Sequence, residues 1–361
     1  MNRLILIGNG FDLAHKMKTS YCDFITDYMV GVVKNFLNND IHDDVLVNIR
    51  FRYGGRSHNK VHKIQVDEKN VWTILQKITE QDQFVLTYKS NFFRDSINKI
   101  HTLNWVDLEN DYFENLLRCS SRSVYDINSV IKLNKEFDFI REELEKYLFR
   151  IQSDNDINIS SDLAELFYET IKAHDIVTIN IADHNPKEVM FLSFNYTDTI
   201  VKYIERYAEI YKSQTLTKIN YIHGKLGTKR NPIIFGYGDE YNKRYLEFED
   251  IRNKELLKHI KSFGYFKTSN YHDLLRFLNL DHFQVYILGH SLGVTDRTML
   301  KQIFEHENCK SVKIFYHEKD ESTNDYTDKT YDLASHFSDK EMMRNKIVTF
   351  DKSRAMPQPV K

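Results

Sequence analysis

Four short segments of this sequence carry side chains that can take part in chemistry, and three of them contain glycine. The first, GNGFD at Gly8–Asp12, directly follows the apolar run Leu4–Ile7. Two glycines after a strand let the backbone turn tightly and approach a phosphate, and a following helix would present free N–H groups to it. Position 13 is leucine, so the third glycine of a dinucleotide-binding fingerprint is absent. The segment therefore predicts either a pyrophosphate-binding turn or an ordinary turn from strand to helix.

The second and third segments each place one polar side chain after a strand-like run. Asn195 follows Val189–Phe194, and its amide could hold a ribose hydroxyl or a water molecule. Asp198 comes shortly afterwards and could contact the same ligand or cap the next helix. His223 ends the run Ile219–His223. Imidazole titrates near neutral pH, so His223 is a candidate general base, although a lone histidine is often structural.

The fourth segment, GHSLGVTD at Gly289–Asp296, allows two interpretations. It matches the G-x-S-x-G nucleophile elbow of α/β hydrolases, with Ser291 as nucleophile and Asp320 and His336 as its candidate partners. Only 68 residues follow Gly293, which is short for the rest of a hydrolase core. In the other interpretation the segment is a further nucleotide-binding loop, whose backbone and Ser291 hydroxyl contact phosphate or ribose.

The elements that would position these segments alternate between strands and helices. Two later strand-like runs, Val312–Tyr316 and Lys346–Phe350, extend the series, and helical patterns cover Ile251–Leu280 and Thr295–His306. A further glycine pair lies at Gly236 and Gly238. The alternation predicts an α/β fold with a Rossmann-like, mainly parallel sheet that carries helices on both faces. In such a sheet the strand ends share one ligand-binding edge.

The stretch between the first two predicted strands does not follow this alternation. Residues 56–223 contain no glycine and a single proline, Pro186, and they show helical stripes such as Trp105–Tyr112. We predict a helical insertion at residues 35–183, which could act as a lid, an oligomerisation module or a sensor. Residues 1–34 and 184–361 would form the nucleotide-binding domain. The basic segment Arg50–Lys63 is interpreted as a solvated loop or hairpin rather than a nucleic-acid contact.

Composition narrows the class of protein. The chain has 361 residues, of which 41% are hydrophobic, and a net charge of −2, so neither disorder nor a polyanionic partner is indicated. No run approaches the ~18 apolar residues of a membrane span, and the first residues do not resemble a secretory signal. Cys22, Cys119 and Cys309 form no CxxC pair, and no carboxylate cluster has the spacing of a metal site. We expect a soluble cytoplasmic protein with no metal.

Taken together, the segments resemble the AbiH family of bacterial phage abortive-infection proteins. The likeness lies in Leu6–His15 with Lys18–Tyr21, and in the later blocks Trp105–Glu109, Phe194–Thr197, Ile222–Gly224 and Gly289–Leu292. The set is also similar to the sirtuin-like fold of bacterial antiviral NAD hydrolases. That resemblance implies that Gly8 and Gly10 bind the pyrophosphate, Asn195 lies at the nicotinamide ribose, His223 is the catalytic histidine, and Gly289 with Ser291 contacts the adenosine side.

The sequence departs from the sirtuin pattern at three places. Asp12 replaces a serine, Lys18–Tyr21 replaces a Pro-x-Phe-Arg element, and Asp198 follows the asparagine by three positions instead of two. Deacetylating sirtuins carry a four-cysteine zinc module that three scattered cysteines cannot build. If the chain uses NAD, the resemblance therefore implies hydrolysis rather than transfer to acetyl-lysine.

The leading hypothesis is an antiphage effector that binds and hydrolyses NAD or a related nucleotide. A phage-derived trigger and a homo-oligomer are candidate partners, whereas a membrane or a nucleic acid is not expected. The alternatives are a nucleotide-binding sensor without catalysis and a serine hydrolase that uses Ser291. Asn195 and His223 are the predicted catalytic residues. The predicted ligand contacts are Gly8, Asn9, Gly10, Phe11, Asp12, Tyr21, Asp198, Gly289, His290, Ser291 and Asp296.

Overall fold

The computed structural model describes most of the chain as two compact units. The described residues are 1–52, 65–80, 84–102, 104–120, 126–154, 157–211, 215–320 and 323–359. The first unit contains Met1–Lys18, Leu148–Arg252 and His259–Lys361, and the second contains Thr19–Tyr147 and Asn253–Lys258. Within the described part of the chain, no helix combines the length and the apolar character needed to cross a membrane.

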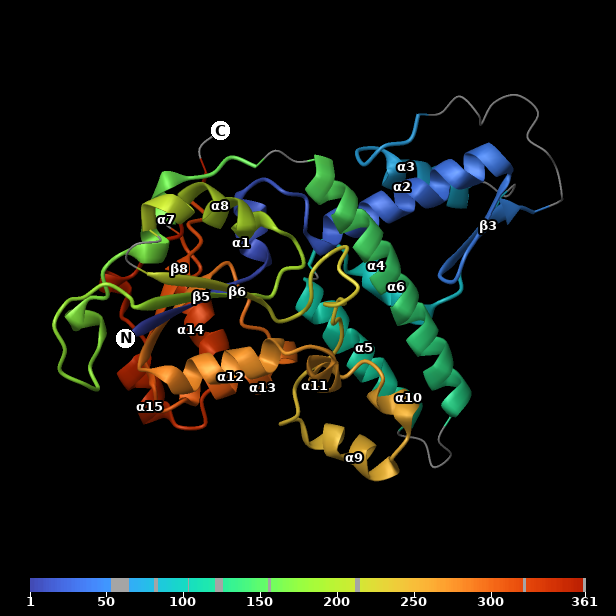
Figure 1. Cartoon of the computed structure of the whole chain (residues 1–361). Coiled ribbons are helices and arrows are strands. Elements are labelled where there is room, and N and C mark those ends of the chain that lie inside the picture. Colours follow the sequence, from blue (N-terminus) through green and yellow to red (C-terminus); the bar gives the residue numbers. More distant parts are fainter. Residues whose placement is uncertain are drawn as a thin grey trace. The chain divides into compact units, whose positions relative to one another are not determined.

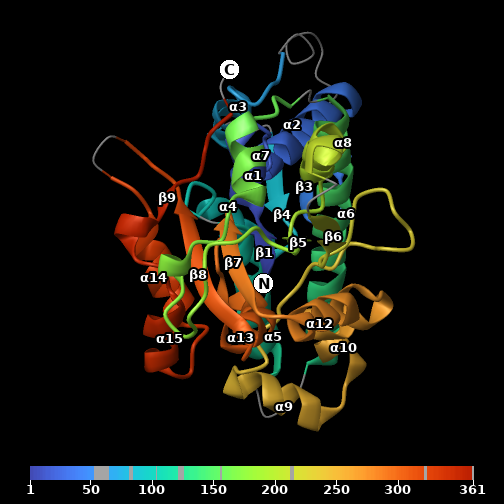
Figure 2. The same ribbon diagram turned by 60° about the vertical axis from the view of Figure 1, so that its left-hand side comes forward.

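A six-stranded parallel sheet lies at the centre of the first unit (Figure 1). The strands run in the order β6-β5-β1-β7-β8-β9 (Figure 2), so the order reverses beside β1. The predicted α/β class and parallel sheet are confirmed. The strands are β1 (Asn2–Ile7), β5 (Glu188–Ser193), β6 (Leu216–Tyr221), β7 (Phe283–Leu288), β8 (Cys309–Tyr316) and β9 (Arg354–Ala355).

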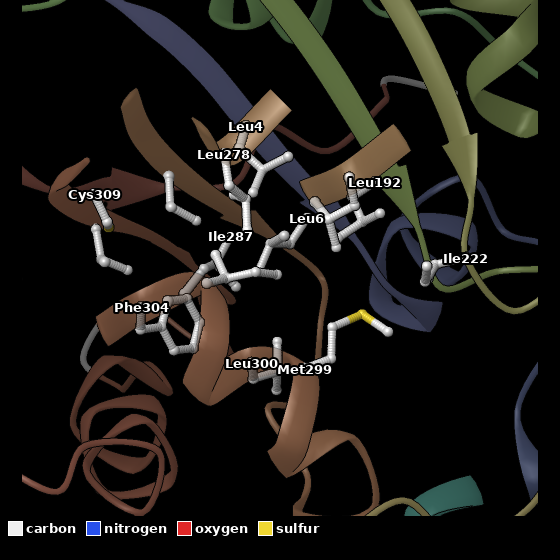
Figure 3. Close-up of a cluster of buried hydrophobic side chains, with 14 of the residues drawn as sticks. Leu4, Leu6, Leu192, Ile222, Leu278, Ile287, Met299, Leu300, Phe304 and Cys309 are labelled. Carbon is white, nitrogen blue, oxygen red and sulfur yellow. The ribbon is translucent and has the colours of Figure 1, made fainter. Parts of the chain in front are cut away.

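Helices cover both faces of this sheet, because successive side chains of a strand point to opposite faces and both faces are apolar. Leu4 and Leu6 of β1 pack with side chains of α12 (Asn270–Leu280) and α13 (Arg297–Glu305) on one face, as Figure 3 shows. Ile5 and Ile7 pack with α1 (Asn9–Ala14), α7 (Ser161–Tyr168) and α8 (Thr199–Tyr211) on the other. The helices of the first unit include α1 (Asn9–Ala14), α7 (Ser161–Tyr168), α8 (Thr199–Tyr211), α9 (Lys243–Ile251), α11 (Lys261–Gly264), α12 (Asn270–Leu280), α13 (Arg297–Glu305), α14 (Tyr326–Ala334) and α15 (Lys340–Lys346).

Strand register brings the carboxyl ends of four strands to one level. Ile7 of β1 pairs with Ser193 of β5 on one side and with Leu288 of β7 on the other, and Ser193 pairs with Tyr221 of β6. The residues that follow these strands therefore lie along a single edge of the sheet. All four chemically notable segments of the sequence begin at this edge.

The second unit differs from the helical insertion predicted at residues 35–183. It includes a three-stranded antiparallel sheet, and the sequence pattern does not predict these short strands. Residue 35 lies inside a helix, and α7 packs against the parallel sheet of the first unit, so both predicted boundaries differ from the observed ones. The elements are α2 (Tyr21–Asn39), β2 (Ile41–Asp43), β3 (Val47–Phe51), α3 (Val71–Glu80), β4 (Phe84–Tyr88), α4 (Asn91–Asn98), α5 (Trp105–Ser120), α10 (Lys254–Leu257) and most of α6 (Ile127–Asp154).

One predicted strand is absent from the structure, and one predicted loop lies partly outside the described residues. The predicted strand Lys346–Phe350 is wrong, because Lys346 ends α15 and only Ile347 forms a bridge, to Val312. The β-branched residues of this segment include Val348, which is buried although it lies outside any strand. Of the basic segment Arg50–Lys63, residues 53–63 lie outside the described part of the chain.

Candidate functional site

Two glycine turns meet at the ends of β1 and β7. The N–H of Gly10 donates to the carbonyl of Gly289 at 2.8 Å. A Cβ on Gly8 would lie 2.4 Å from the Cα of His290, and a Cβ on Gly289, whose φ is +69°, would lie 2.2 Å from the backbone nitrogen of Phe11. Only glycine allows two backbones to approach this closely. The contact explains these glycines without a ligand, and their contact with a pyrophosphate stays a prediction.

The turn after β7 continues into a strained loop. Leu292 has a φ of +60°, a conformation that costs a non-glycine residue about 1–2 kcal/mol. Two buried histidines hold it: Nδ1 of His290 accepts the N–H of Leu292 at 2.9 Å, and Nε2 of His336 donates to its carbonyl at 2.8 Å. Burial lowers the pKa of His290 to about 3 and that of His336 to about 4, so both rings are neutral at pH 7.

This geometry does not support the nucleophile-elbow interpretation of Ser291. A serine nucleophile needs a histidine within hydrogen-bond distance. Among the described residues, no hydrogen bond joins Ser291 to a histidine, and His336 is engaged with Leu292 instead. The side chain of Ser291 is exposed beside the glycine turn.

Asn195 and Asp12 lie beside the first glycine turn. Nδ2 of Asn195 donates to the carbonyl of Gly8 at 2.9 Å, and Oγ1 of Thr197 donates to Oδ2 of Asp12 at 2.6 Å. Oδ1 of Asp12 has no hydrogen-bond partner among the described residues. A buried acceptor without a partner is unfavourable, so a donor from a ligand would satisfy it. Such a ligand would have to move neighbouring side chains, because this oxygen is fully buried.

Burial raises the pKa of Asp12 from 3.8 to about 6, although hydrogen bonds from neighbouring side chains oppose the rise. Its protonated form therefore stabilises the fold below pH 4, and this contribution is lost as pH rises through 6. We expect Asp12→Asn, which cannot ionise, to gain up to about 3 kcal/mol in stability relative to wild type between pH 4 and pH 7.5. Urea unfolding of both proteins across this range measures the difference. A difference that does not change with pH would contradict the assignment.

His223 belongs to a buried cluster of charged and polar side chains. Its Nε2 lies 3.2 Å from Oδ1 of Asp296, and Nζ of Lys261 donates to the same oxygen at 2.8 Å. Nε2 of His290 lies 3.7 Å from the other carboxylate oxygen, Oδ2. The ring of Phe194 meets both imidazoles edge-on, with centroids 5.1 Å from His223 and 4.1 Å from His290. All five side chains are buried.

The charges in this cluster determine the state of Asp296. Burial by itself would raise the pKa of this carboxyl, but Lys261 and then His223 and His290 hold it far below its usual value. Asp296 is therefore a carboxylate at neutral pH and can only accept hydrogen bonds. This carboxylate lies beside Nε2 of His223, where it can orient the imidazole.

The structure brings most of the predicted site residues to the same edge of the sheet. Gly8–Asp12 follow β1, Asn195 follows β5, His223 follows β6, and Gly289–Ser291 follow β7. Asp198 directly precedes α8, and its N–H donates to Oε1 of Gln152. Tyr21 belongs to the second unit, where its ring packs edge-on against Trp105.

Sequence reasoning missed Lys261 and Thr197 as partners of the predicted residues. Thr197 lies inside the segment that contains Asn195 and Asp198, and no motif gives its hydroxyl a role. Lys261 lies in a stretch with no motif; in the structure Gly238 packs against it, and Gly236 packs against the neighbouring His259.

The comparisons with known proteins bear on the resemblance to the AbiH family. Among the described residues, no group of three His, Cys, Asp or Glu side chains could hold a metal ion. No curated protein matches the chain. A family model described as bacteriophage abortive infection AbiH matches residues 4–318, which is most of the chain and includes all four of the chemically notable segments. The chain therefore belongs to the AbiH family of bacteriophage abortive-infection proteins.

Proposed function

We propose that this protein is an antiphage effector that cleaves NAD at the bond between nicotinamide and ribose. Family membership supports the role in phage defence. One observation carries the NAD proposal. A buried amide, Asn195, and a buried imidazole paired with a carboxylate, His223, follow adjacent strands at the edge where the two glycine turns meet.

The strand order supports a nucleotide as the ligand. Numbered along the chain within the parallel sheet alone, the strands run 3-2-1-4-5-6. This is the order of Rossmann dinucleotide-binding sheets, in which the ligand binds outside the carboxyl ends where the order reverses. Here the reversal lies between β1 and β7, whose ends carry the Gly8 and Gly289 turns.

The proposed chemistry uses the chain's own groups in few steps. When the bond between ribose C1′ and the nicotinamide nitrogen breaks, the bonding electrons leave with nicotinamide and positive charge develops on the ribose. Asn195 would orient the ribose hydroxyls or the attacking water. As the water oxygen bonds to C1′, His223 would accept its proton, and Asp296 would stabilise the resulting imidazolium. The products are nicotinamide, ADP-ribose and one proton.

The first test is cleavage of NAD by the purified protein, with nicotinamide and ADP-ribose followed by chromatography. We expect Asn195→Ala and His223→Ala each to lower the rate by about 100-fold or more, because each removes a group that acts on the reacting atoms. His272→Ala is a matched control, since His272 is exposed on α12 and outside the cluster.

The same variants are compared in phage-infected cells, where any trigger is present. NAD should fall on infection in cells with the wild-type protein and stay constant with His223→Ala. Protection from phage without any loss of NAD would overturn the proposal.

A nucleotide-binding sensor without catalysis is the second candidate. The observation in its favour is that the side-chain nitrogen of Asn195 already donates to the carbonyl of Gly8, a contact that joins β5 to β1 and needs no catalytic role. Saturable binding of NAD without turnover, in extracts of infected cells as well as in purified samples, would favour this candidate. Covalent labelling of Ser291 by a fluorophosphonate would instead favour a serine hydrolase.

A further inference from the structure

We infer that Asp296 and Lys261 are positioning residues that hold His223 with its proton on Nε2, so that Nδ1 is the atom that accepts a proton. The catalytic consequence of this inference rests on the proposed function. The position of the proton rests on the geometry of the buried cluster and can be tested separately.

The contact with Asp296 favours one nitrogen of His223 as the protonated one. An ionised carboxylate has no proton to donate, and its Oδ1 lies 3.2 Å from Nε2, so a proton on Nε2 makes this contact attractive whereas a lone pair there would be repelled. The hydroxyl of Tyr265 lies farther from the same nitrogen, at 3.4 Å, and cannot donate to it once it is protonated. Within the described part of the chain, no side chain or backbone group hydrogen-bonds Nδ1 of His223, which leaves its lone pair available.

The second histidine agrees with this arrangement. Nδ1 of His290 accepts the N–H of Leu292, so a neutral His290 carries its proton on Nε2, which faces Oδ2 of Asp296 at 3.7 Å. Asp296 thus lies between two imidazole N–H groups, and Lys261 balances its charge at 2.8 Å. With both rings neutral the cluster has no net charge, and a proton taken up by His223 would lie next to the carboxylate.

The glycine pair Gly236 and Gly238 explains how Lys261 reaches Asp296. Tyr237 exchanges backbone hydrogen bonds with the segment of Lys261: its N–H donates to His259 at 3.0 Å and its carbonyl accepts from Lys261 at 2.8 Å. A Cβ on Gly236 would lie 2.0 Å from the carbonyl of His259, and one on Gly238 would lie 3.3 Å from Cβ of Lys261. The turn that contains Gly236 and Gly238 therefore fixes the position of the Lys261 segment, a role separate from ligand binding.

The position of the proton can be measured directly by nitrogen NMR of protein labelled with ¹⁵N-histidine. We expect the His223 signals, assigned by their loss in His223→Gln, to show a proton on Nε2 and an unprotonated Nδ1 at pH 7. In Asp296→Asn/Lys261→Met, which removes both charges and so avoids an unpaired buried ion, this preference should be lost. A wild-type His223 that carries its proton on Nδ1 would overturn the inference whether or not NAD is cleaved.

The kinetic consequence is measured with the same variants under conditions in which the wild-type protein cleaves NAD. The double variant should lose about 100-fold or more in kcat with little change in KM, because orientation and charge stabilisation of the base are lost while substrate contacts remain. Lys301→Met, which removes the ion pair with Glu305 on α13, is the matched control.

The outcomes separate this inference from the proposed function. Full kcat and an unchanged histidine signal in the double variant would overturn the positioning role. An Nε2 proton that depends on Asp296 and Lys261, in a protein that never cleaves NAD, would refute the proposed function and leave the structural assignment standing.

Discussion

Replacing Gly289 with alanine is expected to lower the free energy of unfolding of the first unit by about 3–5 kcal/mol. The new Cβ would lie 2.2 Å from the backbone nitrogen of Phe11 and 2.5 Å from the carbonyl carbon of Gly10. The N–H of Gly10 donates to the carbonyl of Gly289 and the N–H of Phe11 donates to the carbonyl of Gly8, so this backbone cannot move aside without disturbing the contact between the two turns. The φ of +69° adds strain for any residue with a Cβ.

Gly227→Ala separates these two effects within the same unit. Gly227 has nearly the same φ, +67°, but a Cβ there would meet only the ring of Phe149, at 3.2 Å. That ring is exposed and can turn away, so we expect a loss of about 1 kcal/mol. Equal losses in the two variants would show that backbone strain, rather than the close contact of the two turns, requires glycine at position 289.

The measurement must report on the first unit. Both tryptophans, Trp72 and Trp105, lie in the second unit, so a probe within the parallel sheet is needed. Amide hydrogen exchange of β1 and β7 during a urea titration reports on the sheet itself.

Replacing Arg3 with alanine is the second change with a large expected effect, a loss of about 3–5 kcal/mol in stability. Arg3 is fully buried near the start of β1. Its guanidinium donates to the carbonyls of Phe167 at 3.1 Å and Glu169 at 2.7 Å, at the end of α7 where helix carbonyls lack partners within the helix. It also donates to Oε1 of Gln284 at 3.3 Å and lies 4.1 Å from the ring centroid of Tyr286. Removing it leaves several buried acceptors unpaired.

Two further variants test this explanation. Arg3→Lys keeps the charge but loses the planar fork that reaches several acceptors at once, so we expect most of the loss to remain. Arg354→Ala removes a cation that pairs with the carboxylate of Glu169 at the surface and should change stability by less than about 1 kcal/mol. Amide exchange of β1 again measures the effect. A loss below about 1 kcal/mol for Arg3→Ala would mean that water or a rearranged α7 satisfies these carbonyls.

The sequence was most informative where a strand runs into a glycine turn. Gly8 and Gly289 directly follow β1 and β7, and Gly224 lies shortly after the end of β6. Because the strand register brings these ends to one level, the chemically notable residues that follow them are neighbours. This result needs only local patterns and the general geometry of parallel sheets. The same reasoning failed at Lys346–Phe350, because apolar β-branched residues are equally suited to a buried segment outside the sheet.

The partners of the predicted residues could not be read from the sequence. Lys261 and Asp296 are 35 residues apart, and no periodicity or motif links them. The same holds for Arg3 and Glu169, which are 166 residues apart. Likewise, the sequence predicts that Gly8 and Gly10 contact a ligand, whereas the structure shows that they allow the backbone of Gly289 and His290 to approach closely.

By itself, the sequence determined the α/β class, the strands β1, β5, β6, β7 and β8, the family resemblance and the edge of the sheet to which the candidate residues belong. These follow from side-chain periodicity and turn chemistry, which act over a few residues. Only the tertiary structure decided which nitrogen of His223 faces Asp296, that Lys261 balances the charge, and that an antiparallel sheet lies in the second unit. Such contacts depend on distances between segments remote in the chain, which are set by the packing of the whole fold rather than by any local pattern.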